Sequence, residues 1–149
     1  MKVVIQRVEE AEVKVEDKTV GKIGKGFLVL LGVTHHDTEK DADYLVRKVC
    51  NLRVFEDEND KMNLSLQEVK GSLLIVSQFT LYANCKSGNR PSFIEAARPE
   101  KAEALYEYFI KKCEETGLQV EHGTFGAHME VSLLNDGPVT IEIETKETA

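Results

Sequence analysis

The feature that most constrains the fold is the apolar run FLVLL at residues 27–31, which is enclosed by Gly26 and Gly32. This run is far shorter than the roughly 20 residues that a membrane-spanning helix needs. A short apolar segment between glycines is typical of a strand that is buried on both faces. The run therefore predicts the central strand of a sheet.

Two helices and further strands are predicted around this strand. Residues 1–15 are rich in β-branched residues and end in the alternation VKVE, which indicates a strand with one exposed face. One helix is expected from Asp37 or Thr38, which can cap it, and another from Pro99, a favoured first-turn residue. Their apolar stripes are Ala42, Leu45, Val46, Val49 and Leu52 in the first helix, and Ala102, Leu105, Tyr106, Phe109, Ile110 and Cys113 in the second.

The remaining segments are read as strands and turns. Residues 73–79 form an apolar strand that a loop at 83–98 follows, and residues 124–133 alternate as a strand does. Residues 139–143 repeat this pattern after a turn at 135–138, and the glycines of residues 21–26 indicate a hairpin turn. We therefore expect one α/β domain over residues 1–149, with a mostly antiparallel or mixed, barrel-like sheet and two helices packed on it.

Charge and cysteine content limit the partners and the compartment. The net charge of -7 argues against general affinity for nucleic acid, so any RNA contact must be local. Cys50, Cys85 and Cys113 are far apart and odd in number, which suits a reducing cytosol; by default each is a buried small apolar residue. No secretory or membrane pattern is present, and we expect a cytoplasmic protein. The pair His35-His36 lacks further metal ligands and indicates surface histidines, so no metal is predicted.

Two polar segments are not explained by packing alone. The first, SQFTL at residues 77–81, directly follows the apolar strand, and strand ends commonly aim exposed groups at a ligand. The alternative is that these polar side chains merely terminate the strand. The second segment, NDGPVT at residues 135–140, contains a Gly-Pro pair, which by itself indicates an ordinary hairpin turn.

Together these segments resemble the signatures SQxxT and NxGPVT of the D-aminoacyl-tRNA deacylase family. The resemblance extends to MKVVIQRV at residues 1–8, NLRVFED at 51–57, GNRPSF at 88–93 and GTFGAHMEV at 123–131, and no motif position departs from it. It implies a hydrolase that cleaves the ester between tRNA and a D-amino acid, that also accepts glycine, that spares L-aminoacyl-tRNA and that needs no cofactor.

The same resemblance implies a homodimer in which the Gly-Pro motif of one subunit enters the active site of the other. There the Gly-Pro bond would be cis, and the carbonyls of the motif would hold the substrate amino group so that an L side chain clashes. The implied catalytic residues are Ser77, Gln78, Phe79 and Thr80; the implied substrate-binding residues are Gly137, Pro138, Arg7, Phe125 and Met129; the implied RNA-binding residues are Lys86 and Arg90.

Several of these residues have an ordinary alternative. Arg7 can be a surface charge that does not brace the motif, and Phe125 and Met129 can be core residues that do not border the terminal adenosine. No histidine or carboxylate lies in or beside residues 77–81, so Thr80 is expected to position the substrate and not to attack it. The resemblance implies that the terminal 2′-hydroxyl of the tRNA helps activate the attack. The rival functions are a non-catalytic module that binds an RNA end and a general small-ester esterase that uses Thr80.

Overall fold

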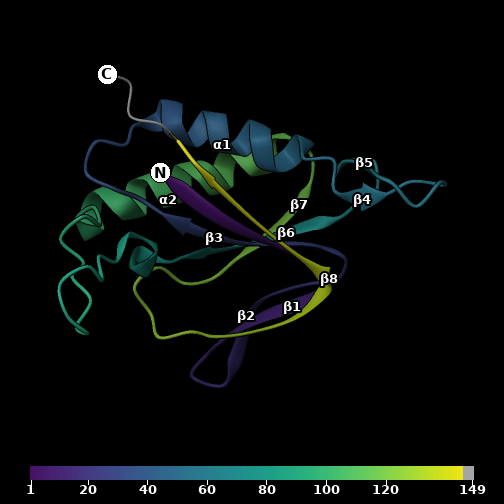
Figure 1. Ribbon diagram of the computed structural model, residues 1–149. Coiled ribbons are helices and arrows are strands. Elements are labelled where there is room, and N and C mark those ends of the chain that lie inside the picture. Colours follow the sequence, from purple (N-terminus) through teal and green to yellow (C-terminus); the bar gives the residue numbers. More distant parts are fainter. Residues whose placement is uncertain (146–149) are drawn as a thin grey trace.

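The computed structural model describes residues 1–145, which form eight strands, two α-helices and one short 3₁₀ helix. In chain order these are β1 (Lys2–Val15), β2 (Lys18–Ile23), β3 (Gly26–Gly32), α1 (Glu39–Asn51), β4 (Phe55–Glu56), β5 (Met62–Leu64), β6 (Ser72–Ser77), η1 (Phe79–Tyr82), α2 (Pro99–Glu115), β7 (Gln119–His122) and β8 (Glu130–Glu144). Figure 1 shows α1 and α2 side by side over one face of the sheet. Among the described residues, no helix combines the length and the apolar character needed to cross a membrane.

The strands form one mixed sheet of six strands and a separate pair made by β4 and β5. The order along the large sheet is β2-β1-β3-β6-β7, and β8 pairs with β1. β1 runs antiparallel to β2, β3 and β8, whereas β6 is parallel to both β3 and β7. Because β2 also contacts β6 and β7, the sheet curls into a nearly closed barrel. The predicted barrel-like mixed sheet with two helices is confirmed.

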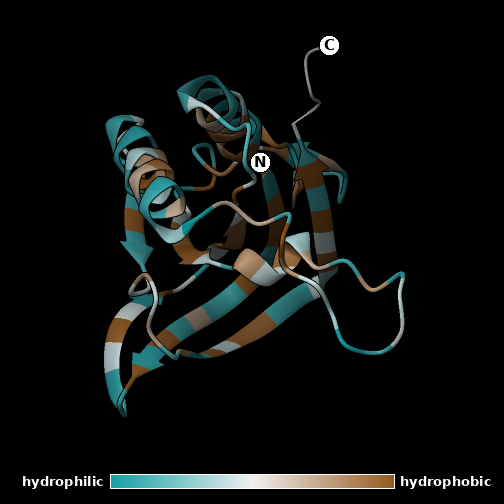
Figure 2. Cartoon of the chain, turned by 90° about the vertical axis from the view of Figure 1, so that its left-hand side faces the viewer, coloured by the Kyte–Doolittle hydropathy of each residue, from teal (hydrophilic) through white to brown (hydrophobic). Residues whose placement is uncertain are grey.

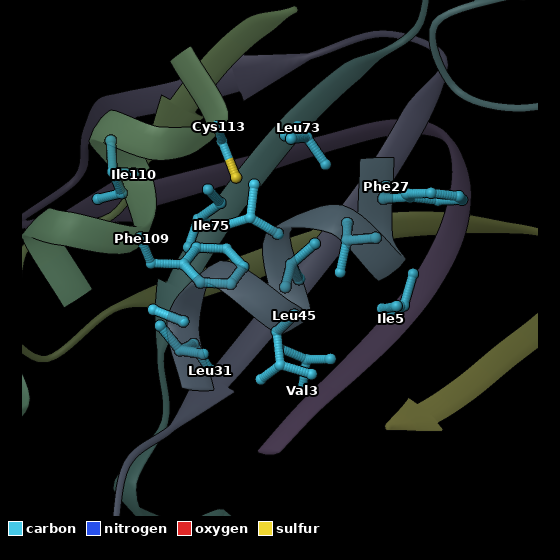
Figure 3. Packing of buried hydrophobic residues seen from close by; sticks show 14 of the residues in the cluster. Val3, Ile5, Phe27, Leu31, Leu45, Leu73, Ile75, Phe109, Ile110 and Cys113 are labelled. Carbon is cyan, nitrogen blue, oxygen red and sulfur yellow. The ribbon is translucent and has the colours of Figure 1, made fainter. Parts of the chain in front are cut away.

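β3 lies at the centre of the sheet and separates two layers of apolar core. Phe27 and Leu31 belong to the same core cluster as Leu45 of α1 and Phe109 of α2, and Figure 3 shows Leu31 beside Phe109. The ring of Phe27 stacks on that of Phe55. Leu28 points into the barrel, where it packs with residues of β1, β2 and β6. In Figure 2 the long strands are banded brown and teal, which is the alternation that a sheet with two different faces requires. The predicted central strand, buried on both faces, is confirmed.

Two of the three cysteines belong to this core. Cys50 of α1 and Cys113 of α2 are buried, as expected of small apolar side chains. Cys85 is exposed, so the default expectation is wrong for this residue. The physical reason is that Cys85 lies in the loop that follows η1, where little of the chain is buried.

The two helices begin where their sequences predict. Thr38 is the N-cap of α1 and forms a capping box with Asp41, and α2 has Pro99 in its first turn. The predicted apolar stripes face the core, although Leu52 and Ala102 are only partly buried. The helices are also joined directly, because the hydroxyl of Tyr108 donates a 2.7 Å hydrogen bond to Oδ1 of Asp43.

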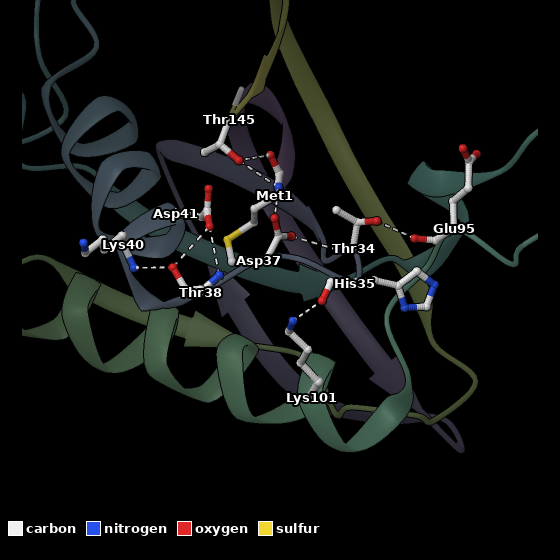
Figure 4. Close-up of polar contacts among 10 residues, drawn as sticks. All are labelled: Met1, Thr34, His35, Asp37, Thr38, Lys40, Asp41, Glu95, Lys101 and Thr145. Carbon is white, nitrogen blue, oxygen red and sulfur yellow. Dashed lines mark hydrogen bonds and ion pairs between the residues drawn. The ribbon is translucent and has the colours of Figure 1, made fainter. Parts of the chain in front are cut away.

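The amine of Met1 is buried and joins three elements, as Figure 4 shows. It lies 2.7 Å from Oδ1 of Asp37, just before α1, and 2.8 Å from the hydroxyl of Thr145, just after β8. The second carboxylate oxygen of Asp37 accepts a 2.7 Å bond from the N–H of Thr34. The start of β1, the start of α1 and the end of β8 are therefore fixed to one another.

The predicted strand over residues 124–133 is correct only over residues 130–133. Residues 124–129 form a turn in which Gly126 has a φ of +79° and the N–H of Ala127 donates to the carbonyl of Thr124. β8 begins only at Glu130. β7 is missing from the prediction because Val120 is its only apolar residue, so it has no alternation to detect.

β8 is continuous where a hairpin turn is predicted at residues 135–138, so that prediction is wrong. In its pairing with β1, Thr140 faces Gln6, yet Asn135 already faces Val8. Residues 136–139 therefore stand opposite the single residue Arg7 of β1, and the strand bulges there. We call residues 136–139 the Gly-Pro bulge.

The hairpin turn predicted at residues 21–26 is wrong as well. Gly21 lies within β2, and β2 and β3 both pair with β1 instead of with each other. Gly21 serves a close approach of chains, because a Cβ atom built there would lie 2.8 Å from the carbonyl oxygen of His122 in β7. The glycine is needed for barrel closure and not for a turn.

Candidate active site

A cavity of about 700 Å³ opens at the carboxyl ends of β3 and β6, and we call it the β6 pocket. Its walls come from the ends of both strands, from the segment before α2 and from the turn before β8. The residues that line it are Leu31, Val33, His35, Val76, Ser77, Gln78, Phe79, Phe93, Ile94, Ala96, Ala97, Arg98, Pro99, Ala102, Phe125, Gly126, Ala127, His128, Met129 and Val131. Five of the predicted site residues are thus brought together, from two segments nearly 50 residues apart: Ser77, Gln78, Phe79, Phe125 and Met129.

A second cavity, of about 770 Å³, lies beside the N-terminus. Its lining includes the ion pair of Met1 and Asp37 and the carboxylates of Asp41 and Glu144. Ligand sites are mostly apolar with a few convergent polar groups, a description that fits the β6 pocket better than this acidic cavity. The β6 pocket is therefore the candidate site, although it is the smaller of the two.

The polar end of the pocket is built where β6 stops. β6 ends at Ser77, two residues before the predicted end at Phe79, and the N–H of Gln78 still donates a 2.8 Å bond to the carbonyl of Leu31 in β3. The chain then turns into η1. The first N–H groups of a 3₁₀ helix have no acceptor within that helix, which leaves those of Phe79 and Thr80 as donors for a ligand.

Thr80 lies beside the pocket and is not among its lining residues. Its hydroxyl accepts a hydrogen bond from the side-chain amide of Gln78. Within residues 1–145, no histidine or carboxylate forms a hydrogen bond with this hydroxyl. An unactivated threonine hydroxyl is a weak nucleophile, so the geometry supplies no means of covalent catalysis by Thr80.

The opposite wall of the pocket is anchored by a buried tyrosine. The hydroxyl of Tyr106 donates to the carbonyl of Ile75 at 3.0 Å and lies 3.2 Å from that of Gly123, and burial raises the pKa of this hydroxyl above its ordinary value. The ring of Phe125 packs on Tyr106 with 5.9 Å between ring centres. Met129 lies against Gly123, where a Cβ atom would come within 2.6 Å of its sulfur. Phe125 and Met129 are half-buried, so they contact the core and also face the pocket.

The Gly-Pro bulge is a second cluster of predicted site residues. The bond between Gly137 and Pro138 is cis, as the resemblance implies, and both residues are exposed. Gly137 has a φ of +138°, and a Cβ atom built on it would lie 2.8 Å from Cγ2 of Val139 and 3.3 Å from Nη2 of Arg7. A side chain at residue 137 would therefore be strained and crowded.

Arg7 fixes this bulge to the body of the protein. It is 4% exposed, so the alternative of a free surface charge does not hold. Its Nε donates a 3.0 Å bond to the carbonyl of Asp136, and its Nη1 donates to the carbonyl of Val54 and to the carboxylate of Glu56 at 3.1 Å. The pKa of Glu56 is held below its ordinary range by its own backbone N–H and then by the bond from Arg7.

The predicted residues therefore occupy separate places on one chain. Neither Arg7 nor any residue of the Gly-Pro bulge lines the β6 pocket. Lys86 and Arg90 also lie outside its lining, in an exposed loop closed at its base by paired backbone bonds between Asn84 and Ser92. The β6 pocket of one chain does not contain its own Gly-Pro bulge.

The other lining residues are missing from the predicted site residues. Among them are His35, Phe93, Ile94, Arg98 and His128. His35 is exposed, as predicted for a surface histidine, yet its Nε2 lies 2.6 Å from the carbonyl of Ile94 and thereby shapes the pocket wall. Phe93 and His128 lie in the family-like segments GNRPSF and GTFGAHMEV. His35 and Ile94 have no such signal, since only the fold brings the loop before α2 against the end of β3.

Comparison with known proteins gives consistent results over nearly the whole chain. The family model described as D-Tyr-tRNA(Tyr) deacylase matches residues 4–144. A D-aminoacyl-tRNA deacylase from Clostridioides difficile is 56% identical over 148 residues, which is 99% of each chain, and one from Thermosipho africanus is 58% identical over 147 residues, again 99% of each.

Solved structures show the same similarity. One titled c-Myc DNA Unwinding Element Binding Protein has a TM-score of 0.92 and 44% identity, and the match covers 98% of this chain and 99% of the other. Another, titled as a probable eukaryotic D-amino acid tRNA deacylase, has a TM-score of 0.80 at 20% identity, which shows a shared fold.

Proposed function

The chain belongs to the D-aminoacyl-tRNA deacylase family, and from this premise we propose that it hydrolyses the ester bond between tRNA and a D-amino acid. The products are free D-amino acid and tRNA with its terminal hydroxyl restored. The observation that carries this proposal is the β6 pocket, in which the predicted residues 77–79 meet Phe125 and Met129. The aminoacyl ester lies at the strand end, and the terminal adenosine lies between the two half-buried apolar side chains.

The strand end supports hydrolysis by positioning. An aminoacyl ester is already activated, so the reaction needs a placed water and a polarised carbonyl. In this proposal, the N–H groups of Phe79 and Thr80, which have no acceptor within η1, bind the oxygen on which negative charge develops. Water adds to the carbonyl carbon, the ester C–O bond breaks, and the departing ribose oxygen takes a proton. The neighbouring ribose 2′-hydroxyl assists the attack, while Gln78 and Thr80 hold this segment in place through their side-chain bond.

Selection against L-amino acids requires a second subunit. The Gly-Pro bulge is exposed and lies outside its own pocket, so in a two-fold symmetric homodimer it enters the pocket of the partner. Its carbonyls hold the amino group of the substrate, which turns an L side chain into the protein and a D side chain toward solvent. Arg7 bonds to the carbonyl of Asp136 and so keeps the bulge in position. Glycine has no side chain to clash, so glycyl-tRNA is also a substrate.

The tRNA is held locally. Lys86 and Arg90 lie on the exposed loop next to η1 and contact phosphates of the acceptor end, whereas the net charge of -7 opposes broader contact. Aminoacyl-tRNA is used in translation, so the enzyme acts in the cytoplasm.

The test compares three substrates: D-Tyr-tRNA, L-Tyr-tRNA and D-Tyr methyl ester. We expect hydrolysis of D-Tyr-tRNA alone, measured by release of labelled tyrosine. A non-catalytic module that binds RNA ends would cleave none of the three. A general esterase would also cleave the methyl ester, and a deacylase without chiral selection would cleave both tRNA esters.

A further inference from the structure

Three exposed apolar side chains gather at the mouth of the β6 pocket, and we call them the apolar rim. Phe79 is 56% exposed, Phe93 is 38% exposed and Ile94 is 81% exposed. All three line the pocket, and the rings of Phe79 and Phe93 meet edge to face with 5.1 Å between centres. Single exposed apolar residues are ordinary, whereas a group beside a ligand pocket marks a contact surface.

The exposure of Ile94 is imposed by a fixed backbone. The carbonyl of Ile94 itself lies 2.6 Å from Nε2 of His35. Further along, Thr34 bonds to the carbonyl of Glu95, and Lys101 bonds to the carbonyl of His35, as Figure 4 shows. Before Ile94, the backbone of Ser92 is paired with that of Asn84. The segment is therefore held on both sides of Ile94, so the side chain is presented outward before any ligand arrives.

The surroundings of the rim are locally basic on an acidic protein. Residues 83–98 contain Lys86, Arg90 and Arg98 against a single acidic residue, Glu95. Arg98 lines the pocket and is 82% exposed, and its contact with Glu100 is long at 3.9 Å. Apolar surface beside cationic side chains is the combination that holds unpaired nucleotides, because bases pack on the former and phosphates pair with the latter.

We infer that the apolar rim, and Ile94 above all, seats the base of the nucleotide that precedes the terminal adenosine of the tRNA. The inference rests on the proposed function: with the ester at residues 77–79 and the adenosine in the pocket, the RNA strand must leave through the pocket mouth. The rim flanks that mouth, and Arg98 lies where the connecting phosphate leaves. The site therefore recognises an unpaired RNA end and not merely an adenosine ester.

The experiment compares two substrates that share the ester and the adenosine. D-Tyr-tRNA has the preceding nucleotide, whereas D-tyrosyl-adenosine does not. Ile94→Ala should raise KM for D-Tyr-tRNA about fivefold, the effect of losing part of one apolar contact, and should leave kcat unchanged. Kinetics on D-tyrosyl-adenosine should not change. Ile94→Phe should restore the KM for D-Tyr-tRNA because its ring supports stacking.

A matched control and a binding measurement complete the test. Met62→Ala removes another exposed apolar side chain, 52% exposed on β5, and should change neither KM. Binding of uncharged tRNA to Ile94→Ala should weaken about fivefold with an unchanged salt slope, because no phosphate contact is lost. Arg98→Ala should make the affinity for uncharged tRNA less dependent on salt, because it removes a phosphate contact.

Three outcomes would overturn the inference. The first is an equal effect of Ile94→Ala on both esters, and the second is no effect on either ester. The third is a difference in oligomeric mass between Ile94→Ala and the wild type. Such a difference would mean that the rim is a contact between copies of the chain. If the wild-type protein cleaves neither ester, the proposed function fails, and the binding of uncharged tRNA to wild type and Ile94→Ala still decides whether the rim seats RNA.

Discussion

Gly137 illustrates how a single residue controls the Gly-Pro bulge. Its φ of +138° belongs to a region that L side chains rarely adopt, and Val139 already fills the space beside it. On the other side, Arg7 reaches the bulge through the carbonyl of Asp136. The shape of the bulge thus depends on the lack of a side chain at Gly137 and on the side chain of Arg7.

Gly137→Ala should lower the rate of D-Tyr-tRNA hydrolysis by about tenfold or more, because strain of this kind costs about 1–3 kcal/mol and is relieved only by moving the bulge. The matched control is Gly117→Ala, since Gly117 also has a positive φ, +86°, but has open space around it. Both variants should keep the circular dichroism spectrum of the wild type. Equal rates for the two variants would show that the bulge has no part in the reaction.

Thr80→Ala should retain measurable hydrolysis, because the hydroxyl of Thr80 contacts only the amide of Gln78 among the described side chains. The loss should be about tenfold, the share of a positioning group and not of a nucleophile. Rapid-quench mass spectrometry of the wild type should find no acyl-enzyme. A tyrosyl adduct on Thr80 would refute the positioning role.

At the residue scale, sequence reasoning finds the residues that form a local motif. Residues 77–80 and the Gly-Pro pair are contiguous and could be recognised as segments. Ile94 could not, because it faces the pocket only after the loop before α2 is tied to His35. The burial of Arg7 was likewise beyond sequence, since its partners at residues 54 and 136 come from distant parts of the chain.

At the scale of elements, the contact between α1 and α2 determines how the helical layer responds to pH. Tyr108 must be protonated to donate its bond to Asp43, and this bond, followed by burial and the negative charge of Asp43, raises the pKa of Tyr108 to about 12. A tyrosine whose pKa is raised in the folded state stabilises that state fully when the pH is below the pKa of the tyrosine in the unfolded chain, about 10. Its contribution is lost as the pH rises from there through the folded pKa.

Tyr108→Phe should therefore be less stable than the wild type at pH 8, and the difference in free energy of unfolding should shrink by pH 11. Urea unfolding of both proteins at the two pH values measures this difference. Tyr82 and Tyr106, whose pKa values are also raised, are present in both proteins and cancel in the comparison. A difference that stays constant or grows would contradict the role given to this bond.

The elements themselves were predictable to the extent that their patterns were local. Both helices and β3 follow from capping residues, apolar spacing and flanking glycines. The alternation over residues 124–133 was misleading, because Gly126 turns the chain and Phe125 points to the pocket instead of continuing a strand. β8 was divided in two because a Gly-Pro pair resembles a turn, while its pairing with β1 is visible only in three dimensions.

At the scale of the whole molecule, the separation of the two clusters is the main constraint on mechanism. The β6 pocket holds the end of β6, and the exposed Gly-Pro bulge lies outside this pocket on the same chain. Under the proposed function, a complete site needs two copies of the chain, each of which provides a pocket and a bulge. In a two-fold dimer this arrangement makes two identical sites.

Mixing two inactive variants tests this account most directly. Ala127→Trp fills the β6 pocket with an indole but keeps the bulge, and Gly137→Ala spoils the bulge but keeps the pocket. In a mixed dimer, the intact pocket of one subunit faces the intact bulge of the other. Refolding the two together at equal amounts makes half of the dimers mixed, each with one intact site, so about a quarter of the wild-type activity on D-Tyr-tRNA should return. Activity no greater than the average of the two variants alone would show that each pocket works without the bulge of its partner.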